Sequence, residues 1–86
     1  MIEKRLQIKN KWGLHARPAA KFIKLTSQFK SQVYLEKEGE RANGKSILEI
    51  LSLALECGSW VKVKVDGEDE EEAIRIIQDF LCKEGT

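Results

Sequence analysis

Residues 60–65, Trp-Val-Lys-Val-Lys-Val, form the most regular pattern in this sequence. Successive side chains of a strand point to opposite faces, so the three valines fall on one side and the two lysines on the other. A strand with one apolar face and one charged face is typical of an antiparallel sheet that helices cover on one side only. The pattern therefore favours an α+β fold in which one sheet face meets solvent.

The rest of the chain divides into elements of the same layered kind. The periodicity of the apolar residues predicts three helices and three further strands. The helices cover residues 16–27, 46–55 and 70–83, and the strands cover 2–8, 33–35 and 41–43. The resulting order is β-α-β-β-α-β-α, without linkers or repeats, and we expect one small domain over residues 1–86.

Each predicted helix carries an apolar stripe that we expect to face the sheet. The stripes consist of Ala16, Ala19, Ala20, Phe22 and Ile23 in the first helix, Ile47, Ile50, Leu51 and Ala54 in the second, and Ala73, Ile74, Ile77 and Leu81 in the third. The second helix also carries Leu48 and Leu55, which makes it apolar on nearly all sides. Such a short helix is either deeply buried or offers a surface to a partner.

Two patterns predict how helices begin. Ser46-x-x-Glu49 and Asp69-x-x-Glu72 both match the capping box, in which the two side chains bond to backbone N–H groups of the first turn. The acidic run over residues 66–72 is explained by this cap and by the helix dipole. We expect it to bind no metal, because no second segment supplies matching ligands.

Charge and cysteine content exclude several classes of function. The formal net charge of +1 gives no general attraction to nucleic acid or to an anionic membrane. We find neither a secretory signal nor an apolar run long enough to cross a bilayer. Cys57 and Cys82 form no Cys-x-x-Cys motif, which favours two free thiols. We expect a cytoplasmic monomer that binds no nucleic acid and inserts into no membrane.

The residues most suited to chemistry lie in the segment Gly13-Leu14-His15-Ala16-Arg17-Pro18. His15, the only histidine, precedes a predicted helix, and Pro18 falls in the first turn, where its missing N–H is tolerated. A helix N-terminus offers unpaired N–H groups and favours negative charge. Arg17 adds a fixed cation that grips phosphate oxygens. His15 is therefore a candidate phosphoryl acceptor, because imidazole, with an ordinary pKa of about 6.5, is itself a nucleophile.

Other chemistries fit these residues poorly. One histidine and two distant cysteines are too few ligands for a zinc site. No serine or cysteine has a base and an orienting carboxylate near it in the sequence, which disfavours nucleophilic hydrolysis. We expect no cofactor and no enzymatic activity of the chain's own.

The segment around His15 resembles the phosphoryl-accepting site of HPr, the histidine-containing phosphocarrier family of the bacterial phosphoenolpyruvate:sugar phosphotransferase system. A second segment, Asn43-Gly44-Lys45-Ser46-Ile47-Leu48, resembles the regulatory serine segment of that family. Length and element order agree over the whole chain. The resemblance implies an open-faced β-sandwich, in which three helices cover one face of a four-stranded antiparallel sheet.

The resemblance also implies roles for the site residues. His15 takes a phosphoryl group from enzyme I, which phosphoenolpyruvate charges, and gives it to a sugar-specific enzyme IIA; in the family the Nδ1 nitrogen carries the group. Arg17 and the backbone N–H groups of Ala16 and Arg17 hold the phosphoryl oxygens. A catalytic base is not required, because the partners of a carrier perform most of the catalysis.

Regulation at Ser46 is a further implication of the resemblance. An HPr kinase would phosphorylate this serine, and a transcriptional regulator would be among the partners. A phosphate at a helix N-terminus is electrostatically favourable. Glu49, however, stands where many family members have glycine, and a carboxylate one turn from a phosphoserine repels it.

A docking surface for enzyme I is implied by the apolar residues that follow the serine. Ile47, Leu48 and Leu51 match this surface, although core packing explains each of them equally well. Its candidate basic rim, which would affect the rate of association, consists of Arg17, Lys24 and Lys45.

Trp12 departs from the small hydroxyl residue that many family members carry beside the histidine. Its indole either shields a phosphohistidine or narrows the choice of partner, or else it anchors the loop; Trp60 is expected to be structural. Two other functions stay open. One is a paralogue in a nitrogen-related regulatory phosphorelay without sugar transport, and the other is a non-phosphorylated interaction module, against which the presence of both His15 and Arg17 argues.

Overall fold

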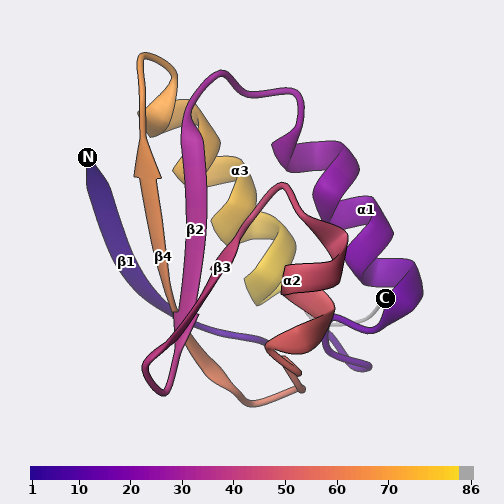
Figure 1. Cartoon of the computed structure of the whole chain (residues 1–86). Coiled ribbons are helices and arrows are strands. Elements are labelled where there is room, and N and C mark those ends of the chain that lie inside the picture. Colours follow the sequence, from indigo (N-terminus) through magenta and orange to yellow (C-terminus); the bar gives the residue numbers. More distant parts are fainter. Residues whose placement is uncertain (84–86) are drawn as a thin grey trace.

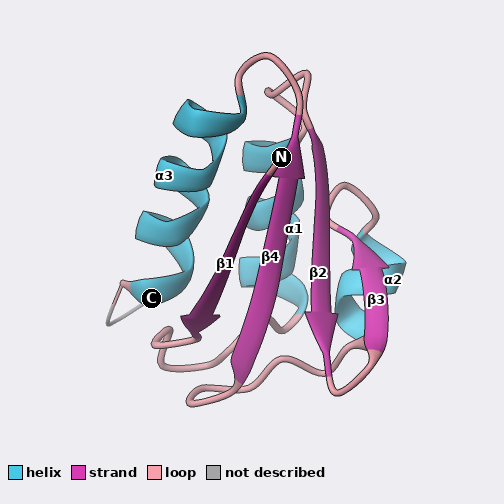
Figure 2. Cartoon of the chain, turned by 90° about the vertical axis from the view of Figure 1, so that its left-hand side faces the viewer, coloured by secondary structure: helices cyan, strands magenta, loops and turns pink. Residues whose placement is uncertain are grey.

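The computed structural model describes residues 1–83 and confirms the predicted order of elements (Figure 1). The strands are β1 (Ile2–Gln7), β2 (Gln32–Lys37), β3 (Glu40–Asn43) and β4 (Trp60–Asp66), and the helices are α1 (Ala16–Thr26), α2 (Ile47–Ser52) and α3 (Glu70–Cys82). The strands form one antiparallel sheet in the order β1-β4-β2-β3. Figure 2 shows the three helices on the same side of this sheet.

The buried face of the sheet follows the predicted alternation of β4. Its three valines are at most 1% exposed. They stand opposite Leu6 of β1 and opposite Val33 and Leu35 of β2, so β4 lies at the centre of the apolar layer. Full burial of one such side chain contributes roughly 1.5–3 kcal/mol. A shift of the register by one residue would expose all three valines, and their burial therefore fixes the strand pairing.

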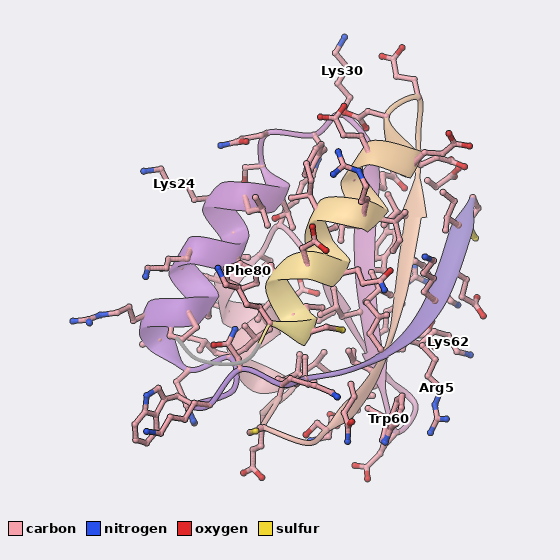
Figure 3. All side chains as sticks on the ribbon, turned by 180° about the vertical axis from the view of Figure 1, so that it is seen from behind. Arg5, Lys24, Lys30, Trp60, Lys62 and Phe80 are labelled. Carbon is pink, nitrogen blue, oxygen red and sulfur yellow. The ribbon has the colours of Figure 1, made fainter. Side chains whose placement is uncertain are left out.

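The opposite face of the sheet is charged, aromatic and open. The Arg5 guanidinium lies 4.7 Å from the centre of the Trp60 ring, and Trp60 is 49% exposed. Lys64 Nζ lies 2.6 Å from the Glu36 carboxylate. Figure 3 shows Arg5, Trp60 and Lys62 on the side of the molecule away from α1. The lysines of β4 thus face outward, as the sequence predicts.

The two long helices differ in how well their stripes were predicted. All four predicted residues of α3 are buried, but in α1 the buried residues are Ala19, Phe22 and Thr26. Ala16 and Ala20 are exposed, so their assignment to the core was wrong. The bulky Phe22 turns its own side of α1 inward, together with Ala19, and packs 5.8 Å from Phe80 of α3, centroid to centroid; Ala16 and Ala20 lie on the opposite side of the helix. Within the described residues, we find no helix of the length and apolarity that a bilayer crossing requires.

Helix α2 is shorter and less buried than predicted. It ends at Ser52 instead of residue 55, because Ala54 adopts a left-handed conformation with φ +52°. Ile50 is the only buried residue of α2, so the predicted core stripe was wrong for its other members. Leu53 and Leu55, which lie beyond the helix end, supply the remaining burial at 5% and 1% exposed. An apolar face of α2 consequently stays in solvent.

Asp69, in the acidic run before α3, binds a different segment from the helix start that it was predicted to cap. Asp69 makes no side-chain capping bond within residues 1–83, so the predicted capping box was wrong there. Its carboxylate instead accepts hydrogen bonds from the Lys30 N–H at 2.8 Å, the Ser31 N–H at 2.9 Å and the Ser31 hydroxyl. These bonds join the α1–β2 loop to the start of α3, and they hold the pKa of Asp69 below its ordinary value, the Ser31 hydroxyl being the largest cause.

We expect Asp69→Asn to lower the folding stability at neutral pH. We also expect the stability of the variant to fall less than that of the wild type as the pH is lowered. A carboxyl whose pKa is depressed by folding stabilises the folded state above its unfolded pKa, and that contribution is lost as pH falls through the folded pKa. The difference in urea midpoint between wild type and variant should therefore be largest near pH 7 and should shrink below pH ~4. Glu68→Gln is the control, since within residues 1–83 Glu68 forms an ion pair with the exposed Lys30 ammonium and with no other group. Equal effects of the two substitutions would contradict the role of Asp69.

Candidate functional site

His15 occupies the N-cap position of α1. Its φ of −81° and ψ of −172° are extended, and its carbonyl accepts the Ala19 N–H at 2.7 Å, which closes the first helical turn. The imidazole makes no capping hydrogen bond with the described residues and is exposed. An exposed imidazole at a helix N-terminus can meet a donor and release an anion without rearrangement of the core.

The loop before His15 is fixed by contacts with the segment that follows α2. The Leu14 N–H donates to the Leu55 carbonyl at 2.8 Å, and the Leu14 side chain is 2% exposed. Gly13 has φ +68°, and a Cβ added there would lie 2.5 Å from the Leu55 oxygen and 2.8 Å from Glu56 Cα. Only glycine fits this position. The sequence marked Gly13 as a loop residue but gave no indication of this contact.

The start of α1 concentrates groups that attract anions. Ala16 and Arg17 are its first two residues, so their N–H groups have no acceptor inside the helix, and Pro18 has no N–H. The side chain of Arg17 is exposed beside them. The helix dipole adds partial positive charge at the same end. The structure thus brings together the four groups proposed for phosphoryl transfer: the His15 imidazole, the Arg17 guanidinium and the backbone N–H groups of Ala16 and Arg17.

A cleft of about 530 Å³ opens at this helix end. Its lining contains residues that the sequence reasoning named and others that it missed. The lining residues are Asn10, Trp12, His15, Ala16, Arg17, Pro18, Lys21, Phe80 and Lys83. Lys21 lies one helical turn after Arg17, a spacing that could have revealed it. Phe80 of α3 and Lys83, which follows its last residue, carry no local signal. The described lining holds three cations and no carboxylate.

Two residues of the β1–α1 loop have contrasting roles in this cleft. Asn10 is 5% exposed, and its amide donates to the Phe80 carbonyl at 3.3 Å, which ties the loop to α3. Trp12 is 56% exposed, with Lys11 Nζ 5.1 Å from its ring centre. An indole anchored in the core would be buried. The structure therefore places Trp12 as an outer wall of the cleft.

Ser46 caps α2 as predicted. Its hydroxyl accepts the Glu49 N–H at 3.4 Å. The reciprocal half of the capping box differs, because the Glu49 carboxylate accepts the Asn43 N–H at 2.9 Å while the Ser46 N–H donates to the Asn43 carbonyl. The Glu49 carboxylate is therefore held close to the helix start that a phosphate on Ser46 would occupy.

The predicted docking residues lie on the exposed side of α2. Leu48 is 75% exposed, and Ile47 and Leu51 are each 37% exposed. Helices α1 and α2 pack against each other (Figure 1). Lys24 of α1 points into solvent (Figure 3). Lys45 is half-buried, and its ammonium donates to the Phe29 carbonyl at 2.7 Å, so it holds the loop after α1 instead of standing free.

Comparison with known proteins identifies a family and a fold that this chain matches. The family described as the PTS HPr component phosphorylation site matches residues 2–83. An HPr-like protein Crh from Halalkalibacterium halodurans is 42% identical over 84 residues, which cover 98% of this chain and 100% of the relative. The crystal structure of a phosphocarrier protein HPr from Bacillus anthracis superposes with a TM-score of 0.91 at 39% identity, covering 93% of this chain and 95% of that one.

Some similar proteins have structures described as dimers. An HPr from Thermoanaerobacter tengcongensis, 49% identical, has a crystal structure described as a dimer, which superposes with a TM-score of 0.72 and covers 92% of this chain and 91% of that one. The expectation of a monomer for this chain stays a prediction.

Proposed function

The chain belongs to the HPr family, and on that premise we propose that His15 accepts a phosphoryl group from phosphorylated enzyme I and passes it to enzyme IIA of a sugar phosphotransferase system in the cytoplasm. Proteins of this family are phosphocarriers. The observation that carries the proposal is the exposed imidazole of His15 at the start of α1, beside Arg17 and backbone N–H groups that have no acceptor inside the helix.

The transfer step follows from this geometry. The unprotonated imidazole nitrogen attacks phosphorus, a nitrogen–phosphorus bond forms, and the bond to the donor breaks with its electron pair remaining on the donor. A base is not required, because the attacking nitrogen carries no proton. The Arg17 guanidinium and the N–H groups of Ala16 and Arg17 neutralise the phosphoryl oxygens as they approach.

Reversible transfer is consistent with an open site. Binding the phosphoryl group much more tightly than the transition state would slow its release. The groups around His15 lie at the surface, where solvent weakens each charge interaction. The site thus stabilises the phosphoryl group without enclosing it, as a carrier requires.

Phosphorylation by purified partners tests the proposal. Incubation with phosphoenolpyruvate and enzyme I should place an acid-labile phosphoryl group on the protein, and addition of enzyme IIA should remove it. The similarity to Crh from Bacillus subtilis, which its crystal structure describes as a catabolite repression protein, favours one second candidate, a regulatory function without sugar transport. Transfer to a nitrogen-type acceptor but to no sugar-specific enzyme IIA would select that candidate. Absence of any label would contradict both and favour a non-phosphorylated interaction module.

We propose regulatory phosphorylation at Ser46, slowed by Glu49. The cap places the Ser46 hydroxyl at a helix N-terminus, which favours a phosphate, but the Glu49 carboxylate lies one turn away. Incubation with an HPr kinase and ATP should add one phosphate to Ser46, and Glu49→Gln should raise the rate about fivefold by removing a like charge. Mass analysis checks both results. An unmodified Ser46 in wild type and variant alike would refute this prediction.

We propose that the exposed side of α2 docks enzyme I. Leu48→Glu should lower the rate of transfer from enzyme I about tenfold or more, because it puts a charge into an apolar contact. The exposed position predicts a change in unfolding free energy within ~0.5 kcal/mol. Leu48→Gln is the control: it removes the apolar contact without adding a charge, so its difference from Leu48→Glu measures the effect of the charge. Unfolding of the Leu48→Glu protein would instead show that Leu48 supports the core.

A further inference from the structure

The exposed indole of Trp12 has no role in folding that the contacts of residues 1–83 reveal. It is 56% exposed, and its close cationic neighbour is Lys11 of the same loop. Gly13 and Leu14, the next two residues, make the contacts that hold the loop against the segment after α2. The loop therefore keeps its position by other means, and the indole is available for an intermolecular contact.

Trp60 provides an internal comparison for Trp12. It is 49% exposed and has a cation, Arg5, 4.7 Å from its ring centre, so the two tryptophans have nearly the same local environment. Their locations differ. Trp12 lines the same cleft as His15, whereas Trp60 stands with Arg5 and Lys62 on the open face of the sheet (Figure 3).

The cleft beside Trp12 defines the chemistry of a partner. Its described walls combine the apolar surfaces of Trp12, Pro18 and Phe80 with the cations Arg17 and Lys21, and they carry no carboxylate. A complementary surface is apolar at its centre and acidic at its margin. A protein that brings its own phosphorylated residue to His15 must cover this cleft, because the acceptor imidazole lies in the same lining.

We propose that Trp12 is a specificity-determining contact that selects which phosphorylated protein can reach His15. The indole is buried when the partner surface covers the cleft, and only a partner with an apolar recess at that point gains the contact. Tryptophan is one of the residue types enriched among those that dominate the binding energy of an interface. The inference rests on the proposed phosphoryl transfer to His15, and it adds the residue that discriminates between donors.

Two phosphoryl donors of different size test the proposal. Phosphoramidate reaches His15 without a protein surface: its P–N bond breaks, ammonia leaves, and phosphorus bonds to the imidazole nitrogen. Phosphorylated enzyme I must dock. We expect Trp12→Ala to lower kcat/KM for transfer from enzyme I roughly 30-fold, mainly through KM, and to leave the phosphoramidate rate within about twofold. Trp12→Phe should retain much of the transfer.

Trp60→Ala is the matched control, and we expect it to change neither rate. An equal loss with phosphoramidate would overturn the proposal, because Trp12 would then act on the imidazole itself. Unchanged transfer from enzyme I to Trp12→Ala would overturn it as well. An equal loss of transfer from enzyme I in Trp60→Ala would also overturn it. Failure of phosphoramidate to label His15 in the wild type would instead refute the proposed phosphocarrier function. The outcomes thus separate the two claims.

Discussion

Replacing His15 by alanine is expected to abolish the acid-labile phosphoryl label that phosphoenolpyruvate and enzyme I place on this protein. His15 is the only histidine of the chain, so no second imidazole can take over as acceptor. Its side chain is exposed and makes no capping bond within the described residues, and we expect the unfolding free energy to change by less than ~0.5 kcal/mol. Labelling is measured with radioactive phosphoenolpyruvate, and stability by urea unfolding.

The two measurements distinguish loss of the phosphoryl acceptor from loss of the folded structure. Loss of the label in a protein of unchanged stability assigns the phosphoryl group to the imidazole. A label that persists in the variant and survives acid would lie on a hydroxyl group, and the assignment of His15 would be wrong. Loss of label together with loss of the fold would contradict the structural independence of the His15 side chain.

Gly13→Ala should destabilise the fold by about 3 kcal/mol, the largest effect on stability that we predict. A left-handed backbone costs an alanine roughly 1–2 kcal/mol, and the new Cβ would also meet backbone atoms of Leu55 and Glu56 at 2.5 and 2.8 Å. Backbone atoms cannot rotate away as a side chain does. For a domain of this size the melting temperature should fall by roughly 12–24 °C, measured by circular dichroism.

Gly39→Ala isolates the steric part of this effect. Gly39 has φ +83°, close to the +68° of Gly13, but a Cβ added there meets nothing within 4 Å. We expect it to cost only the roughly 1–2 kcal/mol of the left-handed conformation. Equal melting temperatures for the two variants would show that the contact between the His15 loop and the segment after α2 is not tight. Because that contact positions the acceptor loop, Gly13→Ala should also slow phosphoryl transfer where the protein remains folded.

The order of elements and the start of α1 at His15 could be predicted because their signals are local. Alternation in β4 and helical spacing in α3 depend on residues within one element, and both are confirmed. The start of α1 was also predictable, since His15 and Pro18 define a helix N-terminus by backbone chemistry alone. The capping role of Ser46 belongs to the same class.

The errors have a common origin in contacts between distant segments. Asp69 matched a local capping pattern, yet its carboxylate binds the Lys30 and Ser31 N–H groups, which are 39 and 38 residues away. The apolar residues of α2 fitted a core stripe, yet the helix ends early and leaves Ile47, Leu51 and Ala54 exposed. A periodic pattern states which residues share a face, but it does not state whether another element covers that face.

The sequence by itself determined the sheet-and-helix order and the chemistry available at His15, because strand alternation and helix-end charge arise from neighbouring residues. The tertiary structure determined which residues surround His15. Three features depend on segments that meet only after folding. They are the packing of the His15 loop against Leu55, the approach of Phe80 and of Lys83 from the end of α3, and the outward placement of Trp12. Long-range packing therefore surrounds the His15 imidazole with a defined cleft and a defined set of charges.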